Sequence, residues 1–251
     1  PVAALDYARF NAQQDKGKMT GEWLAHCQAC SAPEIASVCR RAKIPFSIVS
    51  GYLQDEQTWS EIASWVRASS AIQGMKRNKL GILGNYYGGM LDVYTDVTLQ
   101  SAVFGTEIKI LEMCELVELR AAVSPEQIRT KLTEFHTAFR VVPECSEAEL
   151  ERAARTSVAL DLLIDKHHLG SMAYYYEGIG EYQNTVTSLI AGNTLLTSKG
   201  TPIAGECEVK NVQAMKIMSL LGSGGSFSEF YLMDFEDDVV MLGHDGPAHT
   251  N

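Results

Sequence analysis

The feature that most constrains the fold of this chain is a regular alternation of short apolar runs with longer segments of helical periodicity. The apolar runs, rich in β-branched and aromatic residues, lie at 44–50, 80–83, 108–112 and 172–176. Segments in which apolar residues recur every three to four positions lie at 22–43, 56–73, 93–103, 125–141, 146–168, 182–196 and 209–221. Strands that alternate with such helices form parallel sheets covered by helices. The sequence therefore predicts an α/β fold with parallel, Rossmann-like sheets and flanking helices.

The pattern changes after the glycine-rich stretch 222–225. Two strand-like runs, 227–235 and 239–242, are separated by three acidic residues, which predicts a β-hairpin and the start of an antiparallel β domain. We therefore predict three domains. They are the C-terminal part of a first α/β domain at 1–75, a second α/β domain at 76–222 and the start of a β-rich domain at 223–251.

Charge and composition exclude several classes of protein. The net charge of −10 argues against binding of nucleic-acid backbone, which requires clustered lysines and arginines. No run of about 18 apolar residues predicts a membrane span, and the N-terminus lacks the pattern of a signal peptide. Six cysteines at irregular spacing in a chain of 251 residues fit free thiols in a reducing compartment. We expect a cytoplasmic protein without nucleic-acid or membrane partners.

Two short motifs in the chain are weak signals. Cys27 and Cys30 have the CxxC spacing of redox and zinc sites, but no second pair accompanies them, and we interpret them as buried structural cysteines. The glycine-rich loop 84–90 follows a predicted strand, as in dinucleotide-binding folds, but lacks the GxGxxG spacing. We interpret it as an ordinary connection from a strand to a helix.

Two acids and a histidine near the end of the chain form a donor set suited to a divalent metal. These residues are Glu206, Glu229 and His244, and each acid follows a glycine- or serine-rich turn, where we expect it to begin a regular element. Two carboxylates and one imidazole suit Mn²⁺, Mg²⁺ or Co²⁺ better than structural zinc. Their spacing alone is also compatible with a solvated acidic surface. Strand alternation places Glu229 and Asp234 on opposite faces of an unbroken strand, so both cannot reach one metal.

Several segments match, in order, the motifs of one family. They are Val49–Glu56, Leu80–Gly84, Gly205–Lys210, Phe227–Tyr231 and Leu242–His244. Through them the chain resembles the L-arabinose isomerase and L-fucose isomerase family of three-domain sugar isomerases. The resemblance implies that Glu206, Glu229 and His244 bind a divalent cation, usually Mn²⁺, and that the two glutamates flank the sugar carbons. It also implies a homo-oligomer, a trimer or hexamer, and a chain that is an internal portion of a longer protein.

The chain departs from the family pattern in three ways. Cys30 stands near the position of a family histidine that contacts sugar in the neighbouring subunit, which leaves the identity of the sugar open. The hairpin between Glu229 and His244 is slightly shorter, and a further histidine ligand of the family lies beyond Asn251.

The resemblance predicts an aldose–ketose isomerase that acts on a pentose or 6-deoxyhexose, such as L-arabinose or L-fucose, through an enediol. Such chemistry requires a Lewis acid at the sugar oxygens and a base at the carbons. The alternative is a non-catalytic sugar-binding or regulatory α/β protein derived from the same family. Residues that we expect to contact the sugar are Tyr176, Glu177, Asp245 and His249. Glu208 and Lys210 are expected to support the ligands, although ordinary packing or surface roles fit these residues equally well.

Overall fold

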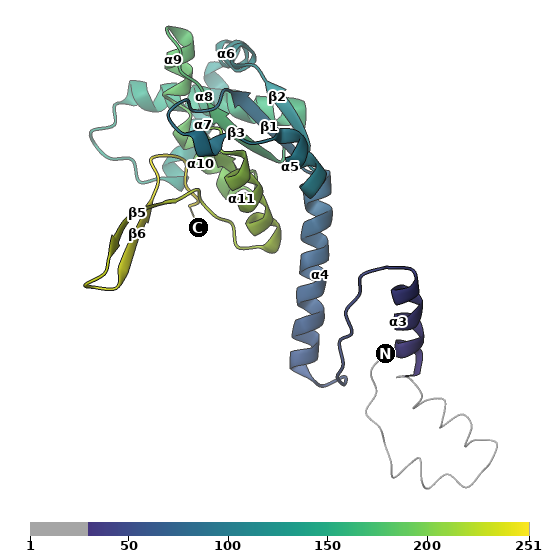
Figure 1. Ribbon diagram of the computed structural model, residues 1–251. Helices are drawn as coiled ribbons and strands as arrows, with labels where there is room; N and C mark the ends of the chain where they lie inside the picture. Colours follow the sequence, from purple (N-terminus) through teal and green to yellow (C-terminus); the bar gives the residue numbers. More distant parts are fainter. Residues whose placement is uncertain (1–29, 251) are drawn as a thin grey trace, which may run out of the picture. The chain divides into compact units, whose positions relative to one another are not determined.

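The computed structural model describes residues 30–250, and in them the expected alternation of strands and helices is present (Figure 1). The chain divides into two compact units, Pro1–Ala68 and Ser69–Asn251. The domain boundaries that the sequence predicts at residues 75 and 222 stay a prediction.

The first unit contains α3 (Ser31–Arg41) and the beginning of α4 (Glu56–Arg77), which continues into the second unit. The prediction of a strand at 44–50 is wrong: this segment forms no regular element, pairs with no described strand and is mostly exposed. A strand requires a neighbour for its backbone hydrogen bonds, and local composition cannot supply one. The helix expected from residue 22 and the first cysteine of the CxxC pair, Cys27, lie outside the described residues. The second cysteine, Cys30, is exposed, so the prediction that it is buried is wrong.

The second unit is built on a four-stranded parallel sheet in the order β2-β1-β3-β4, which confirms the predicted α/β fold. Its strands are β1 (Lys79–Gly84), β2 (Glu107–Leu111), β3 (Ser171–Tyr175) and β4 (Ile203–Ala204). The sequence predicts the first three of these but not β4, because two residues are too few to show a periodicity. This short strand is important because it leads directly to the candidate site.

The helical elements of the second unit follow the predicted segments, with two interruptions. They are η2 (Leu91–Val93), α5 (Val97–Phe104), α6 (Met113–Ala121), α7 (Pro125–Ala138), α8 (Glu147–His167), α9 (Glu181–Val186), α10 (Ile190–Ser198) and α11 (Val209–Leu221). The helix expected at 93–103 is divided because the Asp96 carboxylate accepts hydrogen bonds from the Thr98 and Leu99 N–H groups and starts α5 anew. Within residues 30–250, no helix combines the length and apolar character that crossing a membrane requires.

The helix expected at 182–196 is also divided, into α9 and α10. The Ser188 hydroxyl lies in the break, where it donates to the Asn184 and Thr185 carbonyl oxygens at 2.9 Å each and lies 2.7 Å from the Thr156 hydroxyl. A serine that bonds to nearby backbone in this way competes with continuation of the helix.

Helix starts are placed where the sequence predicts them. Ser124 forms a reciprocal capping box with Gln127: its side chain accepts from the Gln127 N–H, and the Gln127 side chain accepts from the Ser124 N–H. Ser146 likewise accepts from the Glu149 N–H at the start of α8. There the Glu149 carboxylate pairs with Arg152 at 2.6 Å.

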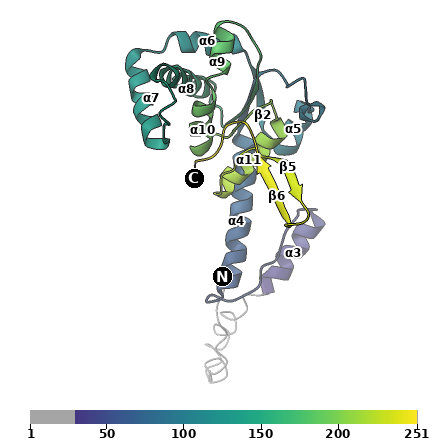
Figure 2. The same ribbon diagram turned by 90° about the vertical axis from the view of Figure 1, so that its left-hand side faces the viewer.

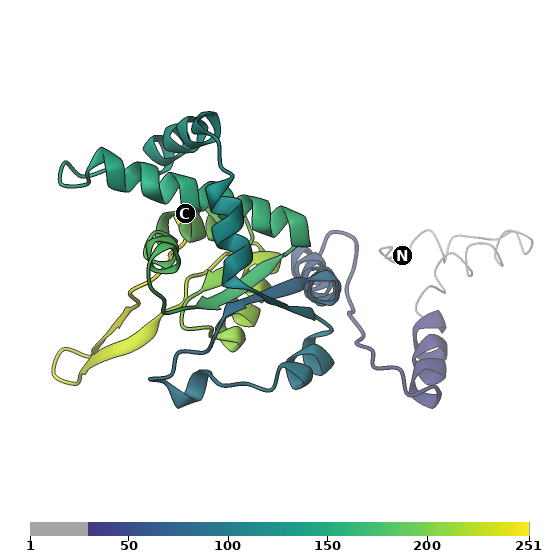
Figure 3. The same ribbon diagram turned by 90° about the horizontal axis from the view of Figure 1, so that it is seen from above.

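Both faces of the sheet are covered by helices (Figure 3). A cluster of buried side chains joins one face to α6, α7, α8 and α10, and includes Leu83, Leu111, Leu116, Phe135, Leu160, Met172, Leu195 and Ile203. A second cluster joins the other face to α11, and includes Leu80, Ile82, Ala173, Ala204, Cys207, Val209, Val212 and Met215. Alternate residues of the central strands therefore serve different cores, as expected for a doubly covered parallel sheet.

The predicted hairpin is present as β5 (Glu229–Asp234) and β6 (Val239–Gly243), and it projects away from the four-stranded sheet (Figure 2). Its register shifts between Phe230 and Leu232, so Tyr231 is an extra residue. Such a bulge interrupts the alternation of side chains. The strand is therefore not unbroken, and the separation of Glu229 from Asp234 that was predicted for an unbroken strand does not apply here.

Candidate functional site

Glu206 lies at the carboxyl end of β4, in the turn that leads to α11. It does not begin a regular element, as the sequence suggested, because α11 starts only at Val209. Both Glu206 and Cys207 have left-handed backbone conformations, with φ of 58° and 59°. This region costs a residue with a side chain about 1–2 kcal/mol. Strain at consecutive non-glycine residues is characteristic of functional sites.

Backbone hydrogen bonds hold this turn in place. The Cys207 N–H donates to the Tyr174 carbonyl oxygen at 2.9 Å, and the Tyr87 N–H donates to the Glu206 carbonyl oxygen at 3.3 Å. The Cys207 side chain is completely buried beneath the turn. The turn is thus attached to β3, to the loop after β1 and to the core below, which explains how the strained conformation persists.

His244 follows β6, and its side chain is 7% exposed. Its ring packs on Phe227 with 4.0 Å between ring centroids and 32° between ring planes. Gly246 is required beside it, because a Cβ atom there would lie 2.5 Å from His244 Nδ1. Phe227 and Gly246 therefore fix the orientation of the imidazole.

The structure brings Glu206 and His244 together. His244 Nε2 lies 3.7 Å from Glu206 Oε1, and both Glu206 Oε2 and His244 Nδ1 are buried without a hydrogen-bond partner. A separation of 3.7 Å is too long for a good hydrogen bond. Two ligands of one cation, each at about 2.1 Å from it, can lie up to ~4.2 Å apart. The pair therefore fits two ligands of a shared divalent cation.

Glu229 is positioned by the hairpin. It is the first residue of β5 and pairs with Gly243, the neighbour of His244. Its charge acts on the Glu206 carboxyl. Within residues 30–250, however, no three His, Cys, Asp or Glu side chains lie close enough together to hold a metal ion. The structure thus assembles two of the three predicted ligands and places the third nearby.

The surroundings of Glu206 favour its protonated form. Burial raises the pKa of its carboxyl group, and the negative charges of Glu229 and Asp92 add to the rise, whereas His244 opposes it. A positive charge near Oε1 would relieve this cost.

Glu208 and Lys210 stabilise the start of α11. Glu208 is the N-cap of the helix: its buried carboxylate accepts from the Lys210 N–H at 3.1 Å and lies 3.4 Å from Lys210 Nζ. Lys210 Nζ also donates to the Asp92 carbonyl oxygen. These contacts tie the helix to η2 and support the turn that carries Glu206.

Tyr176 and Glu177 lie at the carboxyl end of β3, as predicted. The Tyr176 ring packs against Tyr182, with 5.7 Å between ring centroids. Glu177 accepts a hydrogen bond from the Tyr175 hydroxyl, and burial together with this bond raises the pKa of Tyr175 to about 12. Tyr175 also packs against Tyr87 at 4.8 Å, a pair that sequence reasoning missed. The run of three tyrosines at 174–176 was a signal in the sequence. Nothing in the sequence indicated that Tyr87, on another loop, would be the partner of Tyr175.

Asp245 directly follows His244, whereas His249 lies beside Gly224 and Ser226. Asp245 contributes, with Glu206, to raising the pKa of Tyr174 to about 12, although burial is the main cause. The His249 N–H donates to the Ser226 hydroxyl at 2.7 Å. Their predicted contacts with sugar stay predictions.

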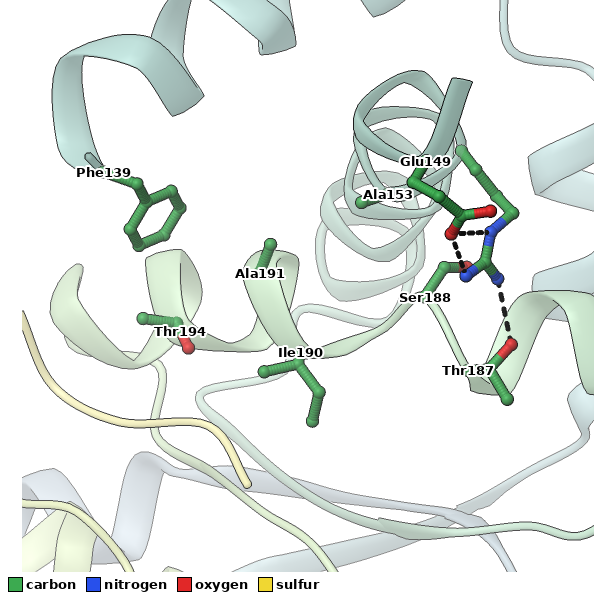
Figure 4. A pocket seen from close by; sticks show the side chains of 9 residues that line it. Phe139, Glu149, Ala153, Thr187, Ser188, Ile190, Ala191 and Thr194 are labelled. Atoms are coloured by element: carbon green, nitrogen blue, oxygen red, sulfur yellow. Dashed lines mark hydrogen bonds and ion pairs between the residues drawn. The ribbon is translucent and has the colours of Figure 1, made fainter. Parts of the chain in front are cut away.

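A cavity lies away from the strand ends, between α8, α10 and the end of α7 (Figure 4). Among the described residues that line this cavity, Arg152 is the cationic one. Its guanidinium donates to the Glu149 carboxylate at 2.6 and 2.9 Å and to the Thr187 hydroxyl at 2.9 Å. A guanidinium committed in this way is poorly placed to bind an anion. We therefore locate the candidate site at the ends of β3 and β4.

Comparison with known proteins identifies the relatives of the chain. It is 23% identical to the L-arabinose isomerase of Aeromonas salmonicida, over 81% of this chain and 42% of that protein. It is 21% identical to the L-arabinose isomerase of Tolumonas auensis, over 95% of this chain and 50% of that protein. It is 20% identical to the L-arabinose isomerase of Shouchella clausii, over 83% of this chain and 43% of that protein. No family model matches the chain.

The chain, which has a parallel α/β fold, is thus similar over most of its length to L-arabinose isomerases, a class of sugar isomerase. Within that class, the resemblance to the L-arabinose isomerases that the motifs predicted is confirmed. The chain spans about half the length of the curated relatives it matches.

Proposed function

We propose that this chain forms part of a metal-dependent aldose–ketose isomerase that acts on a pentose or 6-deoxyhexose, such as L-arabinose or L-fucose. The observation that carries the proposal is the facing pair of Glu206 and His244, each with a buried polar atom that lacks a partner. The similarity to L-arabinose isomerases along most of the chain supports the same reading.

The reaction moves a hydrogen between C1 and C2 of an open-chain sugar. We assign proton transfer to the two glutamates: one removes the proton from C2, and the other carries a proton between the two oxygens, by way of a cis-enediol. Glu206 is suited to the first role, because its partly buried carboxylate faces His244 at the end of β4. The strained turn holds this carboxylate in position before substrate arrives, which reduces the cost of orienting it.

Glu206, Glu229 and His244 would hold the cation, Mn²⁺ or another oxygen-preferring ion such as Mg²⁺ or Co²⁺. When bound, it supplies a Lewis acid for the oxygens on C1 and C2 and lets two nearby carboxylates remain ionised. Glu177, Asp245 and His249 would contact the sugar, and Glu208 and Lys210 would support the site from α11. Tyr176 packs with the cluster of α6 and α8 on the other face of the sheet, so we do not assign it to this site. A homo-oligomer in the cytoplasm fits this proposal.

The test uses the natural full-length protein that contains this sequence. L-arabinose and L-fucose are incubated with it and Mn²⁺, and ketose is measured. We expect ketose formation that chelation abolishes and that Glu206→Gln and Glu229→Gln each reduce at least about a hundredfold, the scale of general acid–base catalysis. The matched control is Glu118→Gln on the exposed side of α6, which should leave the rate unchanged.

Binding of Mn²⁺ to the protein without sugar gives a second readout. His244→Ala should weaken it, because the imidazole would no longer be a ligand. Sugar binding without turnover in the unmodified protein would refute the enzymatic proposal and favour a binding protein.

A further inference from the structure

A separate cavity of about 330 Å³ opens at the carboxyl ends of β1, β2 and β3. Gly84 and Asn85 line it from the end of β1, Glu112 and Cys114 from the junction of β2 and α6, and Tyr176 and Tyr182 from the far side. This volume is near the lower limit for ligand pockets, roughly 300 Å³, so the cavity suits a small ligand.

The topology explains why a cavity forms here. From β1 the chain moves to β2 on one side, and it then crosses back to β3 on the other side of β1. Where connections leave in opposite directions, a crevice opens outside the carboxyl ends of the strands, and α/β proteins bind ligands there. Gly84 keeps the floor of the crevice tight: its φ is 88°, and a Cβ atom there would lie 2.2 Å from the Tyr175 carbonyl oxygen.

The cavity is distinct from the site at Glu206. Tyr175 and Tyr176 are adjacent in β3 and its end, but they pack with different cores: Tyr175 with the α11 cluster and Tyr176 with the cluster of α6 and α8. The backbone N–H of Tyr87 donates to the Glu206 carbonyl oxygen, so the packed rings of Tyr87 and Tyr175 lie beside Glu206. The cavity, which includes Tyr176, therefore opens on the other side of the sheet edge.

The chemistry of the walls indicates the ligand. The Tyr176 and Tyr182 rings pack against each other, with 5.7 Å between ring centroids and 31° between ring planes, and form an aromatic wall of the cavity, while Asn85 and Glu112 supply a donor and acceptors. None of the described residues that line the cavity is Lys, Arg or His, and Glu112 is acidic, so an anion is disfavoured. Aromatic faces combined with a few convergent polar groups suit a molecule with C–H faces and hydroxyl groups.

We infer that this cavity is a binding site for a small neutral polyol or sugar, separate from the reacting carbons of the proposed isomerase. The inference goes beyond the proposed function, because this cavity contains neither Glu206, Glu229 nor His244.

Cys114 provides a direct probe of occupancy. It is exposed and lines the cavity, whereas Cys145 is equally exposed in the loop before α8. The protein is alkylated with iodoacetamide with and without L-arabinitol, and modification of each cysteine is followed by mass spectrometry. At ten times its dissociation constant, L-arabinitol should slow alkylation of Cys114 about tenfold, because the rate follows the unoccupied fraction. The rate at Cys145 should not change.

Three variants separate this cavity from the site at Glu206. Glu206→Gln should keep the protection of Cys114, and Tyr182→Ala should abolish it. Cys114→Phe, which fills the cavity, should remove the saturation-transfer NMR signal of L-arabinitol, while the matched Cys145→Phe keeps it. Circular dichroism checks that each variant is folded.

Equal alkylation of Cys114 with and without L-arabinitol would overturn the inference. So would protection that Glu206→Gln abolishes, since the polyol would then occupy the candidate metal site. Absence of isomerase activity in the full-length protein leaves both of these measurements unaffected, so the inference and the proposed function fail independently.

Discussion

Replacing Glu206 by glycine should stabilise the protein relative to replacing it by alanine. Both changes remove the carboxylate and its unpartnered buried oxygen, so their difference isolates the backbone. At φ of 58°, a residue with a Cβ atom carries about 1–2 kcal/mol of strain that glycine avoids. Glycine in turn loses roughly 0.5–1 kcal/mol more conformational entropy on folding. The glycine variant should therefore be more stable by about 1 kcal/mol.

Urea unfolding of the two variants at equal m-value measures this difference directly. The control is the same pair of substitutions at Glu118, an exposed residue within α6. There glycine should be less stable than alanine by about 1 kcal/mol, so the sign reverses. If glycine and alanine at 206 gave equal stability, or if both sites showed the same sign, the turn would not be strained and this explanation for the position of Glu206 would be wrong.

Three further results are expected. Gly246→Ala should displace the imidazole of His244, because the new Cβ would lie 2.5 Å from Nδ1. We expect the free energy of unfolding in urea to fall by about 1–3 kcal/mol and Mn²⁺ binding to weaken. Unchanged values would show that the ring moves aside freely. Lys131 lies 2.6 Å from the carboxylates of both Glu134 and Asp161. Burial of Glu134 favours a higher pKa, but hydrogen bonds from lysines outweigh it and lower the pKa below 4.5. The stability that the Glu134 carboxylate contributes is therefore present above pH 4.5 and is lost as the pH falls. Lys131→Met should flatten the acid limb of a curve of unfolding free energy against pH. An unchanged limb would contradict the role of the Lys131–Glu134 ion pair. Amides of β5 and β6 should exchange with deuterium orders of magnitude faster than those of β1 and β3, because a two-stranded hairpin with exposed apolar side chains is marginal alone; equal protection in this chain would show that the hairpin is held more firmly than its contacts imply.

The sequence predicts those parts of the fold that depend on local signals. The capping serine at 124 starts α7, the acidic turn after Phe235 joins β5 to β6, and apolar periodicity identifies the long helices. Each signal lies within a few residues of the structure that it specifies. The parallel α/β architecture follows, because only a few arrangements bury alternating strands and helices of this kind.

Errors occur where a distant partner decides the local structure. The run at 44–50 has the composition of a strand but no described strand beside it, and β4 forms from two residues because β3 offers a partner. The break between α9 and α10 depends on Ser188, whose hydroxyl lies beside Thr156 of α8. For β4 and Ser188 a partner far away in sequence helps to decide the local structure, and at 44–50 the described residues offer no such partner.

The residue types of the candidate site, two carboxylates and an imidazole, were determined by the sequence together with the order of its motifs. Only the tertiary structure decided that Glu206 stands in a left-handed turn at the end of β4 and that its carboxylate faces His244. It also decided that the crevice between β1 and β3 remains open beside Tyr176. The reason is physical: a side chain's chemistry is encoded in one residue, whereas its direction, its burial and its neighbours depend on strands and loops that meet only when the sheet has formed.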